Sequence, residues 1–379
     1  MTRRLGMIAA LFAILFGATA GCAPERAMEA GWVLADLAAG GGRSPLKERR
    51  RQPRRSAVAD GDLYEPADGA PVSGLVLVPG AARTGKDDPR LVALADTMAR
   101  ARFAVLIPDL PNLRDLRIGP ADIDGVAAAV DWLAARHGAP VGVAAVSYAA
   151  GPAILAAARP GTAQKVRFVA AIGGYYDLGA ALTFFTTGYY REPPAGPWRW
   201  RRPNAYGKWV FVGGNAGRLA DPRDRSALSE MARRKLADID ADLSDLRRLL
   251  GTEGRAVMDL LDNGDPERVP ALVARLPPGI RADMAALDPA RADLRALRAR
   301  LILVHGRDDA IVPYTESLAL AAAAPPGQVD LFLLNSLAHA DLRPGGMGDA
   351  ARLWWAVYRL LVERDRPPGR PPAARRTGG

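Results

Sequence analysis

The stretch VGVAAVSYAAGPAIL, residues 141–155, decides the fold. Apolar residues lead up to Ser147, and small residues run from there into an alanine-rich segment. A short apolar run is typical of a buried strand, and the alanine-rich segment favours a helix. The stretch therefore predicts a strand, a tight turn and a helix, with a hydroxyl group at the turn. A serine in this position is either a nucleophile or a helix cap, and the stretch alone leaves both roles open.

The alternation of strand and helix continues on both sides of this stretch. Strand patterns are GLVLVPG (74–80), RFAVLIPD (102–109), VRFVAAIGG (166–174), RLILVHG (300–306) and QVDLFLLN (328–335). Helical patterns are LVALADTMARA (91–101), IDGVAAAVDWLAARHG (123–138, with Gly138 as its stop), PAILAAARP (152–160), TESLALAAAA (315–324) and a last segment around Trp354 and Trp355. Strands that alternate with helices imply right-handed crossovers. We therefore predict an α/β fold, a mainly parallel sheet with helices on both faces.

One long segment interrupts this alternation. Between residues 175 and 298 the only strand-like run is KWVFVGG (208–214), and the other patterns are polar and helical, as in ALSEMARRKLADIDADLSDLRRLL (227–250). In α/β sheets, ligands bind at the carboxyl ends of the strands. A helical insertion that leaves one of those ends is placed to cover the site, so we predict that residues 175–298 form a lid.

The first residues predict export. Arg3 and Arg4 precede an apolar run over residues 5–20, which small residues follow up to Cys22, the only cysteine. This order resembles a bacterial lipoprotein signal, which implies a signal peptide over residues 1–21, a lipid on Cys22 and a membrane-anchored protein that faces the periplasm. An ordinary cleaved signal and an uncleaved anchor remain alternatives, and both also export the chain. A lone cysteine excludes an intramolecular disulfide.

Composition sets the outer limits of the folded part. Residues 22–57 are basic and broken by glycine and proline, so we expect a solvated tether there. Residues 366–379 are proline-rich and predict a disordered tail. The domain then spans residues 58–365. The formal net charge of +10 comes mostly from arginines spread along the chain, and no recognition motif accompanies it, so nucleic acid is not an expected partner. The oligomeric state remains open.

Four motifs follow one another in the chain: LVLVPGAA (75–82), VSYAAG (146–151), HGRDDAIVP (305–313) and LAHAD (337–341). Together they resemble the α/β-hydrolase superfamily, over about residues 64 to 364. The usual G-x-S-x-G turn reads A-x-S-x-A here, with Ala145 and Ala149 in place of the glycines. The resemblance implies a nucleophilic Ser147 and hydrolysis of an ester, thioester or amide, without a metal or an organic cofactor.

The superfamily's chain order, serine then acid then histidine, implies the other two members of the triad. His339 is the only histidine that follows both a candidate acid and the last strand, and Asp309 is the acid before it. Asp177 remains an alternative acid. Of the other histidines, His137 ends a polar helix and His305 precedes a turn, and neither lies in a cluster of metal ligands.

An oxyanion site needs two backbone N–H groups aimed at the developing negative charge. The resemblance implies the N–H of Tyr148 as one donor and, from the loop after the first core strand, the N–H of Ala81 as the other, although sequence leaves the second donor open. The start of the predicted lid carries aromatic residues that would line an apolar acyl pocket, or would form the lid's own core: Tyr175, Tyr176, Phe184 and Phe185.

The leading interpretation is a serine hydrolase that cleaves a small-molecule carboxylic ester through an acyl-enzyme. Two alternatives remain. An acyltransferase would use the same residues with an alcohol in place of water. A non-catalytic scaffold would bind a ligand or an envelope partner, and the complete Ser, Asp, His set argues against it.

Overall fold

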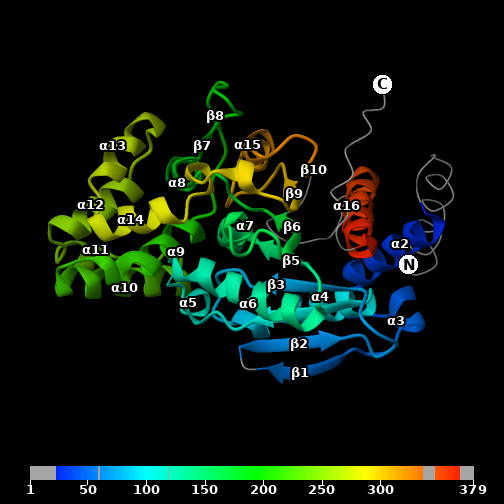
Figure 1. Cartoon of the computed structure of the whole chain (residues 1–379). Coiled ribbons are helices and arrows are strands. Elements are labelled where there is room, and N and C mark those ends of the chain that lie inside the picture. The colour runs from blue at the N-terminus through cyan, green and yellow to red at the C-terminus, as the bar shows by residue number, and fades with distance from the viewer. Residues whose placement is uncertain (1–22, 59, 118, 336–345, 368–379) are drawn as a thin grey trace.

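The computed structural model of the 379-residue chain describes residues 23–58, 60–117, 119–335 and 346–367. Within these residues, eight strands form one sheet in the order β1-β2-β4-β3-β5-β6-β9-β10 (Figure 1). Their bounds are β1 (Arg54–Val58), β2 (Gly61–Glu65), β3 (Ser73–Val78), β4 (Phe103–Pro108), β5 (Val141–Val146), β6 (Val166–Ile172), β9 (Arg300–Gly306) and β10 (Val329–Leu334). The β1–β2 and β2–β4 pairs are antiparallel, and the other pairs are parallel. The predicted mainly parallel sheet is therefore confirmed.

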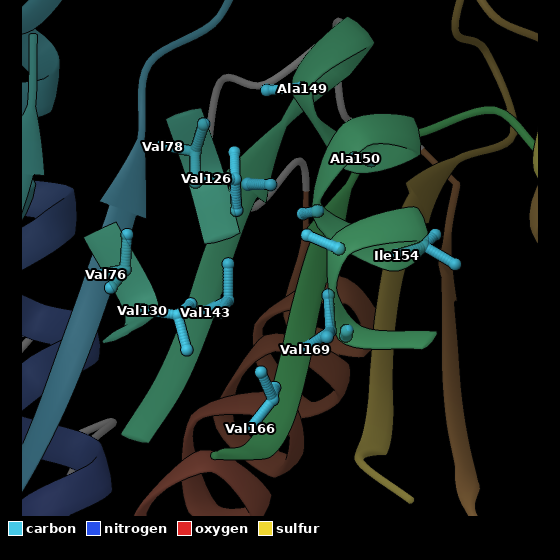
Figure 2. Packing of buried hydrophobic residues seen from close by; sticks show 14 of the residues in the cluster. Val76, Val78, Val126, Val130, Val143, Ala149, Ala150, Ile154, Val166 and Val169 are labelled. Carbon is cyan, nitrogen blue, oxygen red and sulfur yellow. The ribbon is translucent and has the colours of Figure 1, made fainter. Parts of the chain in front are cut away.

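Helices cover both faces of this sheet. On one face, α6 (Ala121–His137) and α7 (Ala150–Ala158) pack against residues such as Val76, Val143 and Val169 (Figure 2). Helix α15 (Thr315–Ala323) contributes Leu320 to the same apolar cluster. On the other face, α4 (Pro89–Arg100), α16 (Met347–Asp365) and α2 (Pro24–Ala39) pack against residues such as Val105 and Phe168. Strands buried on both faces are apolar along their whole length, which is the pattern seen in the sequence.

The segment predicted as a tether is folded. Its helix α2 buries Ala30 and Val33 in the core beneath α16, and the indole Nε1 of Trp354 donates to the carbonyl oxygen of Ala27 at 3.1 Å. The short helix α3 (Pro45–Arg49) and strand β1 follow within the same segment. The tether prediction is therefore wrong for residues 23–57. The prediction relied on the average composition of the whole segment. That average does not reveal an amphipathic helix such as α2, whose apolar face is buried only when the chain folds.

Other predictions about the termini fall outside the described residues. The signal peptide over residues 1–21, the lipid on Cys22 and all but the first two residues of the tail predicted over residues 366–379 belong to this group. Of those two residues, Arg366 pairs with the Glu363 carboxylate at 3.1 Å, so the predicted disorder is wrong for it. In the part of the chain that is described, none of the helices combines the length and the apolar composition that a bilayer crossing requires.

The segment between β6 and β9 folds mainly as helices. Its elements are α8 (Leu178–Thr187), the paired strands β7 (Tyr189–Tyr190) and β8 (Arg199–Trp200), α9 (Tyr206–Asn215), α10 (Pro222–Ala237), α11 (Ser244–Arg247), α12 (Thr252–Leu261), α13 (Val269–Ala274) and α14 (Pro278–Ala286). The helices share a separate apolar core that includes Leu228, Met231 and Leu260. Figure 1 shows α10 to α14 grouped at one end of the molecule, with α2 and α16 at the other.

One element of this insertion differs from its prediction. The run KWVFVGG was expected as a short strand and lies instead in helix α9. Its Trp209 and Val212 are three residues apart, and both are buried in the insertion's core. Residues at this spacing share one face of a helix, and a short apolar run fits either structure until its packing partners are known.

Candidate active site

Ser147 occupies a strained turn between strand and helix. Strand β5 ends at Val146, a 3₁₀ turn η2 covers Ser147–Ala149, and α7 begins at Ala150. The φ angle of Ser147 is +58°, in the left-handed region. A residue with a Cβ atom pays about 1 to 2 kcal/mol to adopt this conformation, so the surrounding packing has to hold it. This is the backbone geometry of a nucleophile turn.

Close packing around the turn explains its small residues. Ala149 and Ala150 are buried against the sheet (Figure 2). A Cβ atom on Gly151 would lie 2.1 Å from the Tyr175 hydroxyl oxygen, and one on Gly174 would lie 2.4 Å from the Ala150 Cβ. The first turn of α7 therefore lies directly against the chain that leaves β6. Alanine fits two residues from Ser147 on each side, whereas α7 requires glycine at position 151.

The loop after β3 runs beside the same turn. Val78, the last residue of β3, pairs with Ala145 in β5. A Cβ atom on Gly80 would lie 3.7 Å from the carbonyl oxygen of Val146, so the loop passes within van der Waals distance of the residue before Ser147. Ala81 follows in this loop and is partly buried. The roles of the Ala81 and Tyr148 N–H groups as oxyanion donors stay predictions.

Asp309, like Ser147, lies at the carboxyl end of a parallel strand. It follows β9 and is 1% exposed, whereas its neighbour Asp308 is exposed. The Oδ1 atom of Asp309 accepts from the backbone N–H groups of Ile311 at 2.8 Å and Val312 at 3.0 Å. These bonds fix the carboxylate in the loop. Of the two adjacent aspartates, the buried and oriented one is the predicted acid.

Sheet register relates Ser147 to Asp309. In β6, Ile172 pairs with Val146 on one side and with Val304 on the other. The turn after β5, which carries Ser147, and the loop after β9, which carries Asp309, therefore both leave the sheet at the carboxyl ends of its parallel strands. Only β6 lies between them. Neighbouring strands lie about 4.8 Å apart, so the two loops begin about 10 Å from each other. This separation leaves room for an imidazole ring between a serine and an aspartate.

Asp177, the alternative acid, caps a helix. Its Oδ1 atom accepts from the backbone N–H of Ala180 at 3.0 Å, at the start of α8. An N-cap of this kind stabilises a helix by about 1 kcal/mol, and it accounts for the aspartate without any catalytic role. The geometry favours Asp309 over Asp177.

Two histidines of the three are in the described part of the chain. The ring of His305 is buried, with Nδ1 at 2.7 Å from the Ser317 hydroxyl oxygen and Nε2 at 3.0 Å from the carbonyl oxygen of Val312. Its Nε2 also lies 3.5 Å from Oδ2 of Asp309. His137 is at the end of α6, where burial and then the charge of Arg167 lower its pKa.

The predicted base, His339, lies outside the described residues. The chain on either side of it is described. Strand β10 runs parallel to β9, and the N–H of Asn335, directly after it, donates to Oδ1 of Asp349 at 2.9 Å. The segment that carries His339 therefore begins at the edge of the sheet where Asp309 lies.

The four predicted pocket aromatics are placed differently. Tyr175 is buried, stacks on Tyr148 with ring centroids 6.0 Å apart and donates from its hydroxyl to the carbonyl oxygen of Leu287 at 2.8 Å. Phe184 is fully buried and packs with Tyr190 and Tyr314. Phe185 packs against Phe211 in the insertion's core. Tyr176 is only partly buried. The packing of the two phenylalanines favours a structural role, and contact with an acyl group stays a prediction.

Sequence reasoning missed two buried carboxyl groups near this edge. Asp122 accepts from the N–H of Gly119 at 2.9 Å and from the Tyr148 hydroxyl at 3.3 Å, and burial raises its pKa to about 6. Burial also raises the pKa of Glu316 to about 8. In sequence, each is an acidic residue in the first turn of a helix, a common pattern that carries no sign of burial.

A cavity of about 320 Å³ lies between the β1–β2 hairpin, the loop after β4 and helix α6, with Leu106, Trp132 and Asp122 among its lining residues. In the described ranges, no three His, Cys, Asp or Glu side chains are grouped as metal ligands.

Comparison with known proteins bears on the fold. No protein-family model and no curated protein matches the chain. Among solved structures, a candidate hydrolase from Legionella pneumophila matches with a TM-score of 0.50 at 15% identity, over 81% of this chain and 84% of that one. A rice cell wall degrading esterase from Xanthomonas oryzae matches with a TM-score of 0.47 at 16% identity, over 80% and 84%. Together with the mainly parallel eight-stranded sheet, the likeness to the Legionella protein shows that the chain has the α/β-hydrolase fold.

Proposed function

We propose that this protein is a serine hydrolase that cleaves carboxylic esters, with thioesters and amides as further substrate classes, through an acyl-enzyme on Ser147. The observation that carries the proposal is the φ angle of +58° at Ser147, in a turn between strand and helix at the carboxyl edge of the sheet. Strained backbone of this kind is concentrated at active sites and ligand-binding sites. A serine that only capped a helix would have an extended backbone instead.

The proposed reaction has two halves. In the first, His339 takes the proton of the Ser147 hydroxyl as the oxygen attacks the ester carbonyl carbon, and the N–H groups of Tyr148 and Ala81 stabilise the oxyanion. The imidazolium then protonates the leaving alkoxide, and the alcohol departs. In the second, water gives a proton to His339 and attacks the acyl-enzyme, and the acid leaves as Ser147 regains its proton.

Asp309 has the supporting role in both halves. A buried carboxylate beside the imidazole sets its tautomer and stabilises the imidazolium that forms. Its bonds to the N–H groups of Ile311 and Val312 hold the carboxylate in place, so it does not need to reorganise during the reaction.

The deciding experiment is labelling of the purified protein with a fluorophosphonate probe, followed by turnover of p-nitrophenyl esters of increasing chain length. We expect a covalent adduct on Ser147 by mass spectrometry and no adduct in Ser147→Ala. An adduct on another residue would move the nucleophile. Absence of both labelling and turnover in a folded protein would favour the non-catalytic scaffold. Product transfer to an added alcohol in preference to water would identify an acyltransferase.

We also propose that the chain is exported and held at a membrane by a lipid on Cys22. Because α2 begins at Pro24 and packs on α16, such a lipid would bring this end of the domain directly to the bilayer, without a spacer. We expect Cys22→Ser to move the protein from the membrane fraction to the soluble fraction without a change in ester turnover. An unmodified mature N-terminus at another residue would contradict the proposal.

A further inference from the structure

Tyr148 is held at several points. Its backbone forms the 3₁₀ turn after Ser147, its ring stacks on Tyr175 with an interplanar angle of 24°, and its hydroxyl lies 3.3 Å from Oδ2 of Asp122. The side chain therefore extends from the proposed oxyanion donor to a carboxylate on a different element, α6. This contact joins α6 directly to the turn that carries Ser147.

The Asp122 carboxylate is also held by a contact other than Tyr148. The residue is 2% exposed, and the oxygen that faces Tyr148 also accepts from the N–H of Gly119 at 2.9 Å, just before α6 begins. A carboxylate in the first turn of a helix is favoured by the helix dipole, whereas burial disfavours its charge. The position of the Asp122 Oδ2 atom is thus fixed by a hydrogen bond from a backbone N–H group.

The insertion reaches the same place through Arg218. This residue ends the 3₁₀ turn η3 (Ala216–Arg218), and its guanidinium pairs with the Asp283 carboxylate of α14. A Cβ atom on Gly119 would lie 3.0 Å from the Nη2 atom of Arg218, so the cation lies beside the loop that binds Asp122. Its charge favours the ionised form of Asp122 and strengthens the acceptor that Tyr148 uses.

We propose that Asp122 is a positioning residue for the reaction, because its carboxylate holds the Tyr148 hydroxyl and thereby fixes the Tyr148 N–H that binds the oxyanion. The inference rests on the proposed function of Ser147. An oxyanion donor acts through its preorganised position, and a donor that wanders loses transition-state stabilisation while ground-state binding changes little. Removal of the hold should therefore lower kcat and leave KM nearly unchanged.

The test compares four variants with the wild-type enzyme. Tyr148→Phe removes the hydroxyl and keeps the N–H, Asp122→Ala removes the acceptor, and Asp122→Asn keeps an acceptor oxygen. The double variant Tyr148→Phe with Asp122→Ala completes a cycle. The matched control is Tyr314→Phe, which loses a buried tyrosine's hydrogen bond of 2.7 Å to Glu192 and has no contact with Asp122 in the described structure.

We expect kcat to fall about 10- to 100-fold in Tyr148→Phe and Asp122→Ala, less than the loss of a whole oxyanion donor. The double variant should be no slower than the slower single variant, Asp122→Asn should recover most of the rate, and Tyr314→Phe should keep the wild-type rate. KM and the thermal midpoint are measured on every variant. Multiplicative losses in the double variant, or an unchanged kcat in Tyr148→Phe, would overturn the inference.

Hydrogen exchange separates this inference from the proposed function. A peptide that covers residues 141–155 should exchange faster in Tyr148→Phe and in Asp122→Ala, and at the wild-type rate in Tyr314→Phe. If the wild-type protein is neither labelled at Ser147 nor active on esters, the proposed function fails, and exchange still reports whether Asp122 holds the turn. If the wild-type protein is labelled and turns over esters, but exchange and kcat are unchanged in both Tyr148→Phe and Asp122→Ala, the role of Asp122 is refuted while the proposed function stands.

Discussion

The Oε2 atom of Glu316 accepts a hydrogen bond of 2.8 Å from the backbone N–H of Asp177. The same oxygen accepts from the N–H of Tyr176 at 3.0 Å, so α15 holds the first residues of the insertion. The insertion's other end meets them there, because the N–H of Ala290 donates to the carbonyl oxygen of Tyr176 at 3.1 Å. Both ends of the insertion are therefore fastened to each other beside a buried carboxyl group.

This arrangement predicts a pH-dependent stability. Burial holds the pKa of Glu316 at about 8 in the folded protein, above its ordinary value of 4.5. The fold favours the protonated form, so its contribution to stability is complete below pH 4.5 and is lost as the pH rises through 8. In Glu316→Gln, the free energy of unfolding should fall less between pH 5 and pH 9, by on the order of a few kcal/mol.

Thermal or urea unfolding over that pH range measures the effect. The exposed Glu48→Gln provides the control and should follow the wild-type curve. A Glu316→Gln curve that is parallel to the wild-type curve would mean that Glu316 titrates in its ordinary range.

The strained backbone at Ser147 predicts a difference between two inactive variants. Ser147→Ala keeps a Cβ atom at a φ of +58°, and Ser147→Gly does not. We expect neither variant to bind a fluorophosphonate probe, and we expect the glycine variant to be more stable than the alanine variant by about 1 kcal/mol. Urea unfolding of the two variants measures this, and a more stable alanine variant would contradict the strain.

The two candidate acids should separate by their effects. Asp309→Asn should lower kcat by about 10⁴-fold if it orients the base, with the fold retained. Asp177→Ala should remove the cap of α8, cost about 1 kcal/mol of stability and leave kcat within a few-fold of wild type. Ester turnover and urea unfolding are measured on both variants, and the reverse pattern of kcat values would transfer the acid to Asp177.

The phenylalanines of α8 should act on stability. Phe184 is 0% exposed and packs on Tyr190 and Tyr314. Phe184→Ala should therefore lower the free energy of unfolding by about 3 to 5 kcal/mol. The chain-length profile of kcat/KM should not change. A change of that profile by about 1 to 3 kcal/mol at retained stability would instead place Phe184 in the acyl pocket. Phe185→Ala gives the same test for the face that packs on Phe211.

The docking of α2 predicts a contrast within one helix. Val33 is 0% exposed and Met28 is 44% exposed. Val33→Asp should destabilise the domain by more than about 3 kcal/mol, because it buries an unpaired charge. Met28→Asp should change stability by about 0.5 kcal/mol or less. Equal urea midpoints for the two variants would mean that α2 is not docked in solution.

The sequence by itself determined the central strands, their flanking helices and the turn at Ser147. Each of these is encoded by residues that are neighbours in the chain, through apolar periodicity and turn chemistry. The predicted stop at Gly138 is one example, since that residue has a φ of +69° and ends α6. The fold class followed from the order in which such segments alternate, and its confirmation needed only the sheet.

Tertiary structure decided what depends on contacts between distant segments. Trp354 and Ala27 are 327 positions apart, and contacts at such separations, together with the burial of Val33, turn an apparent tether into a docked helix. Asp122 and Tyr148 meet across 26 positions, and Phe184 packs against Tyr314 from beyond the insertion. Burial sets the pKa of a carboxyl group and the partner of an aromatic ring, and burial is a property of the surrounding fold that local sequence patterns do not contain.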